Sequence, residues 1–426
     1  MIHSLSIQNF LSFEEEMVYS FEASKDKKQE AHQIVEVADG VRLLKIGVVY
    51  GANASGKSNL LNAFEFLKDF WFDVMNSKEE ETSVIPFLLN DQTANEASKF
   101  KLIFYVDSTK FVYQLSITTN NILNESLLFY PGTQPAVIFE RSLSNNISKI
   151  TFGPKIKISQ VAKDEIVIKC LPNMSFFAAY NGVNIEIEEL ELATKWMKAQ
   201  FLNSIETKMS LVSYSENMVS KSKSTKDKIL EFLQKADFNI SAINTEVIKE
   251  DISDEFIEQV KILNIPNSEL ERLQKERSIN TYKTSFEHKI VNEDESVSYK
   301  ELPLRLQSEG TKRVFGLSGG ILKAIEQNAF LAIDEIESKL HPRLIEFVLE
   351  KFLRESIQAQ LLVTTHYDGL LEEDDLLRKD SIWFTEKKED ASTNLYSLAD
   401  FKAVNRITSL QKAYKYGKFG AIPNIE

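Results

Sequence analysis

The sequence has little cysteine and little histidine. Its 426 residues include one cysteine, Cys170, and five histidines. A single cysteine excludes an internal disulfide framework, and so few cysteine and histidine side chains offer no obvious tetrahedral zinc site. We therefore expect a protein of a reducing compartment.

Long apolar runs are also missing. No stretch approaches the roughly 20 apolar residues that span a bilayer, and the N-terminus lacks the basic start and apolar run of a signal peptide. Neither a long repeat nor long heptad arms are visible. These absences predict a soluble, cytoplasmic protein with no membrane partner.

The composition shows a chain that can fold around a large core. Hydrophobic residues make up 43% of it, and 63 acidic residues outnumber 50 basic ones to give a net charge of -13. The length suggests about two or three domains. Because the molecule as a whole is acidic, any contact with nucleic acid must come from a local basic surface.

The residue patterns divide the chain into three parts. Residues 1–186 begin with an alternating, strand-like segment at 5–13 and continue into an antiparallel meander at 100–139. Residues 187–290 carry mostly helical patterns, and residues 291–426 return to alternating strands and helices. We expect an α/β fold with a parallel or mixed central sheet, an antiparallel β lobe and a helical insertion.

A glycine-rich loop follows the apolar run 43–50 and matches the pattern G-x-x-x-x-G-K-[ST]. Its glycines let backbone N–H groups turn toward phosphate oxygens, and the helix expected over 60–72 points its positive end at the same anion. Lys57 would reach the β- and γ-phosphates, and Ser58 would ligate Mg²⁺. The loop consists of Gly51, Ala52, Asn53, Ala54, Ser55, Gly56, Lys57 and Ser58.

Two acids follow a short apolar strand at 329–333. Asp334, at the carboxyl end of a strand beside the phosphate loop, can hold Mg²⁺ through its water ligands. Glu335 can then act as the base that polarises the attacking water. By themselves, two acids at a strand end fit a solvated surface equally well.

A third strand pattern, at 360–365, ends in His366. The acids lie about 30 positions earlier, which leaves room for one crossover helix over 344–353 in a parallel sheet. His366 would then sit beside the acidic strand end and donate to the γ-phosphate. A lone histidine is otherwise more often a core or surface residue.

Two stretches, 307–311 and 317–320, could form a Ser-x-Gly turn that opens a helix and meets the γ-phosphate held by a partner subunit. Only about eight residues, roughly 12 Å of helix, separate Gly320 from the acidic strand, whereas about 18 residues, roughly 27 Å, follow Gly310. We therefore predict that Ser308, Gly310 and Thr311 form this signature. The string at 317–320 then lies inside the signature helix.

With these motifs in place, the sequence resembles the bacterial ABC-type AAA ATPases related to OLD-family and RecF-like heads, many of them encoded in phage-defence operons. The likeness rests on residues 51–61, 308–313, 333–342 and 364–366, with supporting matches at 86–87 and 414–423. It implies a P-loop NTPase fold with an ABC-ATPase head, bound ATP and Mg²⁺, and a place for Asn59 in the nucleotide-binding set. It also implies ATP-driven dimerisation.

The sequence departs from this family in two places. Leu11 stands where relatives usually carry a basic residue near the nucleotide, so this position offers no basic side chain for that contact. The chain also ends shortly after the head. We therefore expect no C-terminal TOPRIM domain and no intrinsic nuclease activity.

Two functions compete. The first is an ATP-hydrolysing regulatory ATPase of an antiphage system that dimerises or oligomerises on ATP and controls a partner effector, such as a nuclease or toxin encoded nearby. The alternative is a RecF- or SMC-like head that clamps DNA, with its contact at Lys221, Lys223, Lys226 and Lys228. Because serines are interleaved with the lysines, that basic patch is more typical of a solvated loop. A transporter ATPase would need a membrane partner, and nothing in the sequence supports it.

Overall fold

The computed structural model describes residues 1–236, 238–262 and 267–423, which form two compact units. The first unit contains Met1–Thr207, Lys323–Ser338 and Ile345–Glu426, and the second contains Lys208–Leu322 and Lys339–Leu344. Within the described residues, no helix combines the length and the apolar character needed to cross a bilayer.

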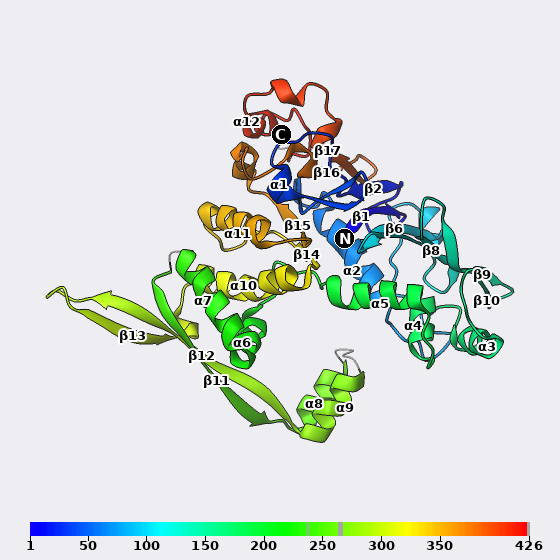
Figure 1. Cartoon of the computed structure of the whole chain (residues 1–426), viewed down its shortest axis with the longest axis horizontal. Coiled ribbons are helices and arrows are strands. Elements are labelled where there is room, and N and C mark those ends of the chain that lie inside the picture. Colours follow the sequence, from blue (N-terminus) through cyan, green and yellow to red (C-terminus); the bar gives the residue numbers. More distant parts are fainter. Residues whose placement is uncertain (237, 263–266, 424–426) are drawn as a thin grey trace. The chain divides into compact units, whose positions relative to one another are not determined.

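The first unit is built on a five-stranded sheet in the order β14-β15-β5-β16-β17. Figure 1 labels four of these strands, β14, β15, β16 and β17. The first four strands run parallel, and β17 is an antiparallel edge strand. Every residue of β5, β14 and β15 is buried, as expected of parallel strands with both faces covered. The strands are β5 Ile46–Gly51, β14 Phe330–Ile333, β15 Gln360–Thr365, β16 Ile382–Lys387 and β17 Thr393–Ser397.

Helices follow two of these parallel strands. Helix α2, Lys57–Phe70, follows β5, and helix α11, Pro342–Glu355, lies between β14 and β15 in the chain. This arrangement confirms the expected crossover helix. Because β14, β15 and β5 are parallel neighbours, their carboxyl ends meet at one edge of the sheet.

A second sheet in the first unit has seven strands in the order β10-β9-β8-β7-β6-β1-β2, and all neighbours are antiparallel. It confirms the predicted meander. Its core face packs against aromatic side chains, among them Trp71, which stacks on Phe177 with ring centroids 3.6 Å apart. The strands are β1 Ile2–Gln8, β2 Met17–Ser20, β6 Ser98–Val106, β7 Thr109–Ile117, β8 Ile122–Tyr130, β9 Ala136–Ser144 and β10 Ile147–Phe152.

Shorter elements complete the first unit. They are α1 Glu30–Gln33, β3 Ile34–Ala38, β4 Val41–Leu44, η1 Thr93–Asn95, α3 Gln160–Lys169, α4 Phe176–Asn181, α5 Glu188–Gln200, η3 Asp368–Glu372, η4 Lys379–Ser381, η5 Leu398–Asp400, η6 Val404–Arg406 and α12 Leu410–Lys415.

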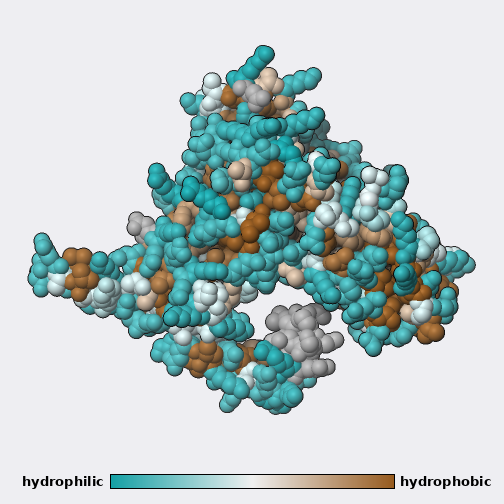
Figure 2. Space-filling view, in the orientation of Figure 1, coloured by the Kyte–Doolittle hydropathy of each residue, from teal (hydrophilic) through white to brown (hydrophobic). Residues whose placement is uncertain are grey.

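The second unit combines helices with a three-stranded antiparallel sheet, β11-β12-β13. Strand β11 pairs with β12 only as far as His288, so the β12–β13 hairpin continues as two strands. Figure 2 shows apolar residues at the end of this hairpin, where Val291 is 66% exposed. The elements are α6 Val212–Lys221, α7 Lys223–Lys235, β11 Ile240–Asp251, α8 Asp254–Ile262, α9 Asn267–Glu276, β12 Ser278–Val291, β13 Val297–Pro303, η2 Leu304–Leu306 and α10 Glu309–Gln327, the last belonging to this unit up to Leu322.

The structure corrects two strand expectations. The segment 5–13 is not one strand, because β1 ends at Gln8 and the backbone of Asn9 and Leu11 is left-handed, with φ of 51° and 50°. The run 43–50 is likewise divided between β4 and β5, with a bend at Lys45.

Residues 187–290 contain the expected helices, and they also contain the long strands β11 and most of β12. Sequence patterns miss this pair because β11 is largely exposed and mixes charged with apolar residues, so it lacks the alternation of a half-buried strand. The compact second unit begins at Lys208 and extends to Leu322. The boundaries expected from the sequence remain a prediction.

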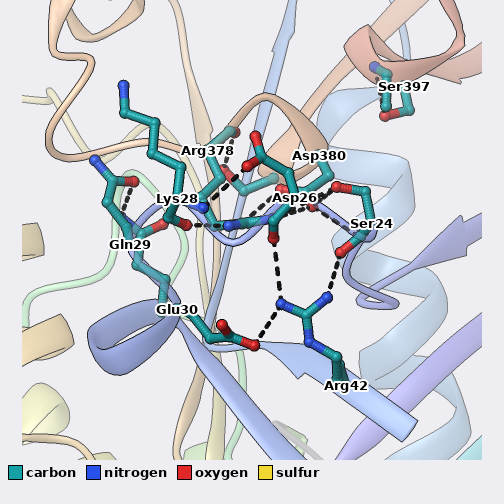
Figure 3. Close-up of polar contacts among 12 residues, drawn as sticks. Ser24, Asp26, Lys28, Gln29, Glu30, Arg42, Arg378, Asp380 and Ser397 are labelled. Carbon is teal, nitrogen blue, oxygen red and sulfur yellow. Dashed lines mark hydrogen bonds and ion pairs between the residues drawn. The ribbon is translucent and has the colours of Figure 1, made fainter. Parts of the chain in front are cut away.

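A polar loop between β2 and α1 is tied to the segment that leads into β16 (Figure 3). The Asp380 carboxylate accepts hydrogen bonds from Ser24 N–H at 2.8 Å and Ser24 Oγ at 2.6 Å. It also accepts from Arg378 Nε at 2.9 Å and Nη2 at 2.7 Å. Arg378 further donates to the backbone oxygen of Asp26 at 3.0 Å, and Arg42 donates to that of Ser24 at 2.7 Å. This network fixes the entry to β16, the neighbour of β5.

Candidate nucleotide site

The phosphate loop, residues 51–58, joins β5 to α2 and depends on two glycines. Gly56 has a φ of +103°, and a Cβ there would lie 2.1 Å from Thr393 Oγ1. A Cβ on Gly51 would lie 2.6 Å from the backbone oxygen of Thr385. Close approach of the β16–β17 hairpin thus excludes side chains at both positions.

This loop borders a pocket of about 380 Å³. Loop residues 53–58 and the following Asn59 form one side of it, and Glu335 and His366 complete the lining. The lining residues come from the carboxyl ends of β5, β14 and β15 and from the start of α2. The structure therefore brings three predicted motifs to one pocket.

The ammonium group of Lys57 lies at this pocket with three close partners. Its Nζ is 2.9 Å from the backbone oxygen of Gly51, 3.1 Å from that of Ala52 and 3.0 Å from His366 Nε2. Burial lowers the pKa of Lys57, while Asp334 acts in the opposite direction. An anion bound in the pocket would favour the charged ammonium, as a phosphate site requires.

Ser58 and Asp334 form an oxygen pair beside the loop. Ser58 Oγ donates to Asp334 Oδ2 at 2.9 Å, and Thr364 Oγ1 donates to Oδ1 at 2.6 Å. Thr207 Oγ1 also lies 3.5 Å from Oδ2. Hydroxyl and carboxylate oxygens are hard ligands, and Mg²⁺ usually takes one or two such protein groups together with waters and phosphates. The donor set thus fits the predicted ion.

Glu335 has an unusual backbone conformation. Its φ of 45° is left-handed, and its N–H is held by Thr364 Oγ1 at 2.8 Å. Its Oε1 lies 3.9 Å from His366 Nε2, and the side chain is 41% exposed at the pocket. A left-handed non-glycine residue costs energy and often marks a functional site. Its carboxylate is placed where water can reach it.

The contacts of His366 define its neutral tautomer. Because the Lys57 ammonium can only donate, a neutral His366 must accept at Nε2 and carry its proton on Nδ1. Burial lowers the pKa of His366, and Lys57 lowers it further. Its backbone N–H donates to Glu337 Oε1 at 2.6 Å, which anchors the turn after β15.

Besides Thr207 and Thr385, four further residues that contact this site were not predicted from the sequence. Thr364 and Glu337 belong to the stretches that carry the family resemblance, but their contacts could not be read from spacing. The other two are Ser12 and Thr393, which contact Asn59 and Ser55 respectively. Asn59 itself lines the pocket while its Nδ2 donates to Ser12 Oγ at 2.8 Å.

The predicted signature lies in the second unit, at the start of α10. Ser308 Oγ accepts from the N–H of Thr311 at 3.1 Å and lies 2.7 Å from Thr311 Oγ1, so Ser308 caps the helix. The structure confirms that 317–320 lies inside α10. There Ser318 is fully buried and a Cβ on Gly319 would lie 2.5 Å from Ser215 Oγ. The competing string therefore serves close packing with α6.

The sheet order, the phosphate loop and the acidic strand end define a P-loop NTPase with an ABC-type head. A family model described as "AAA domain, putative AbiEii toxin, Type IV TA system" matches residues 46–165 and 219–372, more than half of the chain. The chain belongs to this family and is a bacterial ABC-like AAA ATPase.

Solved structures of SMC heads are similar to this chain, with low scores. The SMC head domain from Thermotoga maritima has a TM-score of 0.41 and 11% identity, covering 93% of this chain and 98% of that one. An SMC head bound to the C-terminal winged-helix domain of ScpA has a TM-score of 0.43 and 14% identity, covering 97% and 99%. An SMC head with an extended coiled coil, bound to a ScpA domain from Pyrococcus furiosus, has a TM-score of 0.38 and 13% identity, covering 98% of each chain. No curated protein matches the chain significantly.

Proposed function

We propose that this chain binds and hydrolyses ATP with Mg²⁺ and that two copies close around the nucleotide. The observation that carries the proposal is the convergence of Lys57, Glu335 and His366 on the phosphate-loop pocket, with Asp334 hydrogen-bonded to Ser58 of the loop. Lys57 and the loop N–H groups would hold the phosphates, and Ser58 with Asp334 would hold Mg²⁺, which neutralises charge on the phosphates.

Glu335 is our candidate for the general base, because its exposed carboxylate lies at the pocket beside the proposed metal ligand. Neutral His366 would contact the γ-phosphate. The signature at Ser308, Gly310 and Thr311 would complete the site from a second copy, since its capped helix start offers a hydroxyl, N–H groups and a positive dipole.

The experiment compares ATPase activity and mass in solution for the wild type and Glu335→Gln. Glutamine keeps the shape of the side chain but cannot accept a proton. We expect hydrolysis to fall by about 10² or more and an ATP-bound dimer to accumulate, detectable by light scattering after gel filtration. Hydrolysis by Glu335→Gln at the wild-type rate would remove Glu335 from this role.

For the cell, we propose a regulatory ATPase of an antiphage system that controls an effector such as a toxin or nuclease. The family description supports this, because it names a toxin of a toxin–antitoxin system. The test is co-expression of the chain with proteins encoded beside its gene, followed by phage challenge. Protection that survives unchanged in Glu335→Gln would contradict ATP-dependent control.

A DNA-clamping head is the second candidate. The observation in its favour is that Lys221, Lys223 and Lys228 are exposed around the junction of α6 and α7. Of these, Lys223 begins α7, where a positive charge opposes the helix dipole. Replacement of Lys221 and Lys223 by glutamate would weaken DNA binding and its salt dependence if this surface is used. Unchanged binding would dismiss it.

A further inference from the structure

Thr393, the first residue of β17, lies against the phosphate loop although it is 338 positions away from Ser55 in the chain. Its side chain is buried, with 1% of the residue exposed. Oγ1 is 2.9 Å from the backbone oxygen of Ser55 and 2.7 Å from Ser12 Oγ. Asn59 Nδ2 is 2.8 Å from the same Ser12 Oγ.

The donor directions in this cluster follow from elementary chemistry. A carbonyl oxygen only accepts, so the contact with Ser55 O uses the hydroxyl proton of Thr393. The same hydroxyl is also placed to donate to Ser12 Oγ, so its proton is shared between Ser55 O and Ser12 Oγ, and the Asn59 amide donates to the same Ser12 Oγ. These three contacts connect Asn59, Ser12 and Thr393 to the backbone of the phosphate loop.

Backbone hydrogen bonds hold Thr393 and Ser12 in place. The backbone N–H of Thr393 donates to Ser12 O at 2.7 Å, which fixes the two hydroxyls relative to each other. Ser12 belongs to the turn that follows β1, where Leu11 is left-handed and its N–H donates to Ile85 O at 2.9 Å. Two segments far from the loop in sequence thus converge on one of its peptide groups.

The held peptide group is the one between Ser55 and Gly56. A trans peptide is planar, and its C=O and N–H point to opposite sides. Holding Ser55 O toward Thr393 therefore aims the Gly56 N–H away from Thr393, and Gly56 lines the pocket. The N–H groups of such a loop are the donors that meet phosphate oxygens.

We propose that Thr393, assisted by Ser12, is a positioning residue of the phosphate loop: it holds the Ser55–Gly56 peptide in the orientation that binds phosphate. This inference rests on the proposed ATP binding. Thr393 does not itself touch the reacting atoms. Its loss acts on ATP affinity and on KM, and kcat changes little once the nucleotide is bound.

The test uses Thr393→Val, which replaces the hydroxyl by a methyl group of similar size. Ser55 O and the Ser12 hydroxyl then lose their partner. We expect equilibrium binding of a fluorescent ATP analogue with Mg²⁺ to weaken about tenfold, the size of one such hydrogen bond. KM for ATP should rise in parallel, with kcat within about twofold. Thr393→Ser keeps the hydroxyl and should restore affinity.

Thr82→Val is the matched control, because Thr82 is also buried and its Oγ1 donates to a backbone oxygen, that of Thr118, at 2.8 Å. It lies outside the pocket lining. We expect Thr82→Val to bind ATP like the wild type. Equal weakening in both valine variants, wild-type affinity in Thr393→Val, or no rescue by serine would each overturn the inference.

Ser12→Ala provides a second route if Thr393→Val does not fold. It removes the Ser12 hydroxyl but leaves Thr393 free to donate to Ser55, so we expect a smaller loss, about threefold. If Ser12→Ala bound ATP with wild-type affinity, the proposed assistance of Thr393 by Ser12 would be refuted. If the wild-type protein bound no ATP, the proposed function would be refuted. If the wild type bound ATP and Thr393→Val bound it with the same affinity, only this inference would be refuted.

Discussion

Replacing Asp380 by asparagine would test the polar network that fixes the entry to β16. The Asp380 carboxylate accepts four hydrogen bonds, two from Arg378 and two from Ser24. An amide of the same shape keeps one oxygen, while its NH₂ group faces donors and cannot pair with them. At least the bond from Arg378 Nε to Oδ1 and the negative charge opposite Arg378 are therefore lost, because the other three bonds all fall on Oδ2.

The cost follows from burial. The Arg378 and Asp380 side chains are 2% and 7% exposed. Breaking one partner of a buried ion pair costs about 3–5 kcal/mol. Lys28, on the same loop, forms an ion pair with Asp374 that offers a matched control, because it is 4.0 Å long with side chains 50% and 74% exposed. Such a surface pair contributes at most about 1 kcal/mol.

The assay is urea unfolding followed by tryptophan fluorescence. All three tryptophans, at positions 71, 196 and 383, lie in the first unit, so the signal reports that unit. We expect Asp380→Asn to lower its free energy of unfolding by about 3–5 kcal/mol and Asp374→Asn by less than about 1 kcal/mol. Equal losses of unfolding free energy in the two variants would refute a stabilising role for the buried Arg378–Asp380 pair.

The pH dependence of this difference has a definite sign. Burial alone would raise the pKa of Asp380, but the hydrogen bonds from Arg378 and Ser24 outweigh it and hold the pKa below its usual range. The folded state thus binds this proton less readily than the unfolded state. The stability is present above the unfolded pKa of about 3.9 and is lost as pH falls through the lower folded pKa. A gap between wild type and Asp380→Asn that closes already at pH of about 6 would contradict this.

Two further predictions concern the site. Ser308→Ala removes the helix cap and the proposed γ-phosphate hydroxyl, so we expect ATPase activity to fall about tenfold. Ser318→Ala should stay within about twofold of the wild type, because Ser318 Oγ only donates to Phe315 O inside α10 at 2.7 Å. If Ser318→Ala lost more activity than Ser308→Ala, our choice of signature would be wrong. Glu337→Ala frees the His366 N–H and should lower kcat about tenfold with ATP affinity unchanged, while Glu337→Gln keeps an accepting oxygen and most activity. If both Glu337 variants matched the wild type in steady-state kinetics, the hydrogen bond from the His366 N–H to Glu337 would have no role in catalysis.

The position of the signature helix could be predicted from the sequence. The rise of a helix per residue placed Ser308 rather than Ser318 at a helix start, and α10 indeed spans Glu309–Gln327. Whether Ser308 serves a partner's nucleotide is a property of an assembly, and it stays a prediction. The role of each predicted site residue has the same status.

Much of this protein could be read from residues close together in the chain. The phosphate loop, the apolar strands ending in Asp334 and His366, and the antiparallel meander follow from local spacing and periodicity, which depend only on neighbouring side chains. Where polar and apolar residues mix without period, as in β11, or where Asn9 and Leu11 turn left-handed, the same rules fail. There the conformation is set by contacts that local patterns do not contain.

The tertiary structure alone decided which distant groups support the site. Thr393 reaches Ser55, Glu337 holds the His366 backbone, and Thr364 orients Asp334 and Glu335. Each contact depends on the direction of a hydroxyl or carboxylate over less than about 3.5 Å, and that direction is set only once the strands have packed. The sequence by itself determined which chemistry is present, whereas folding determined how its parts are aimed, because hydrogen bonds are short and directional while sequence patterns record only order and spacing.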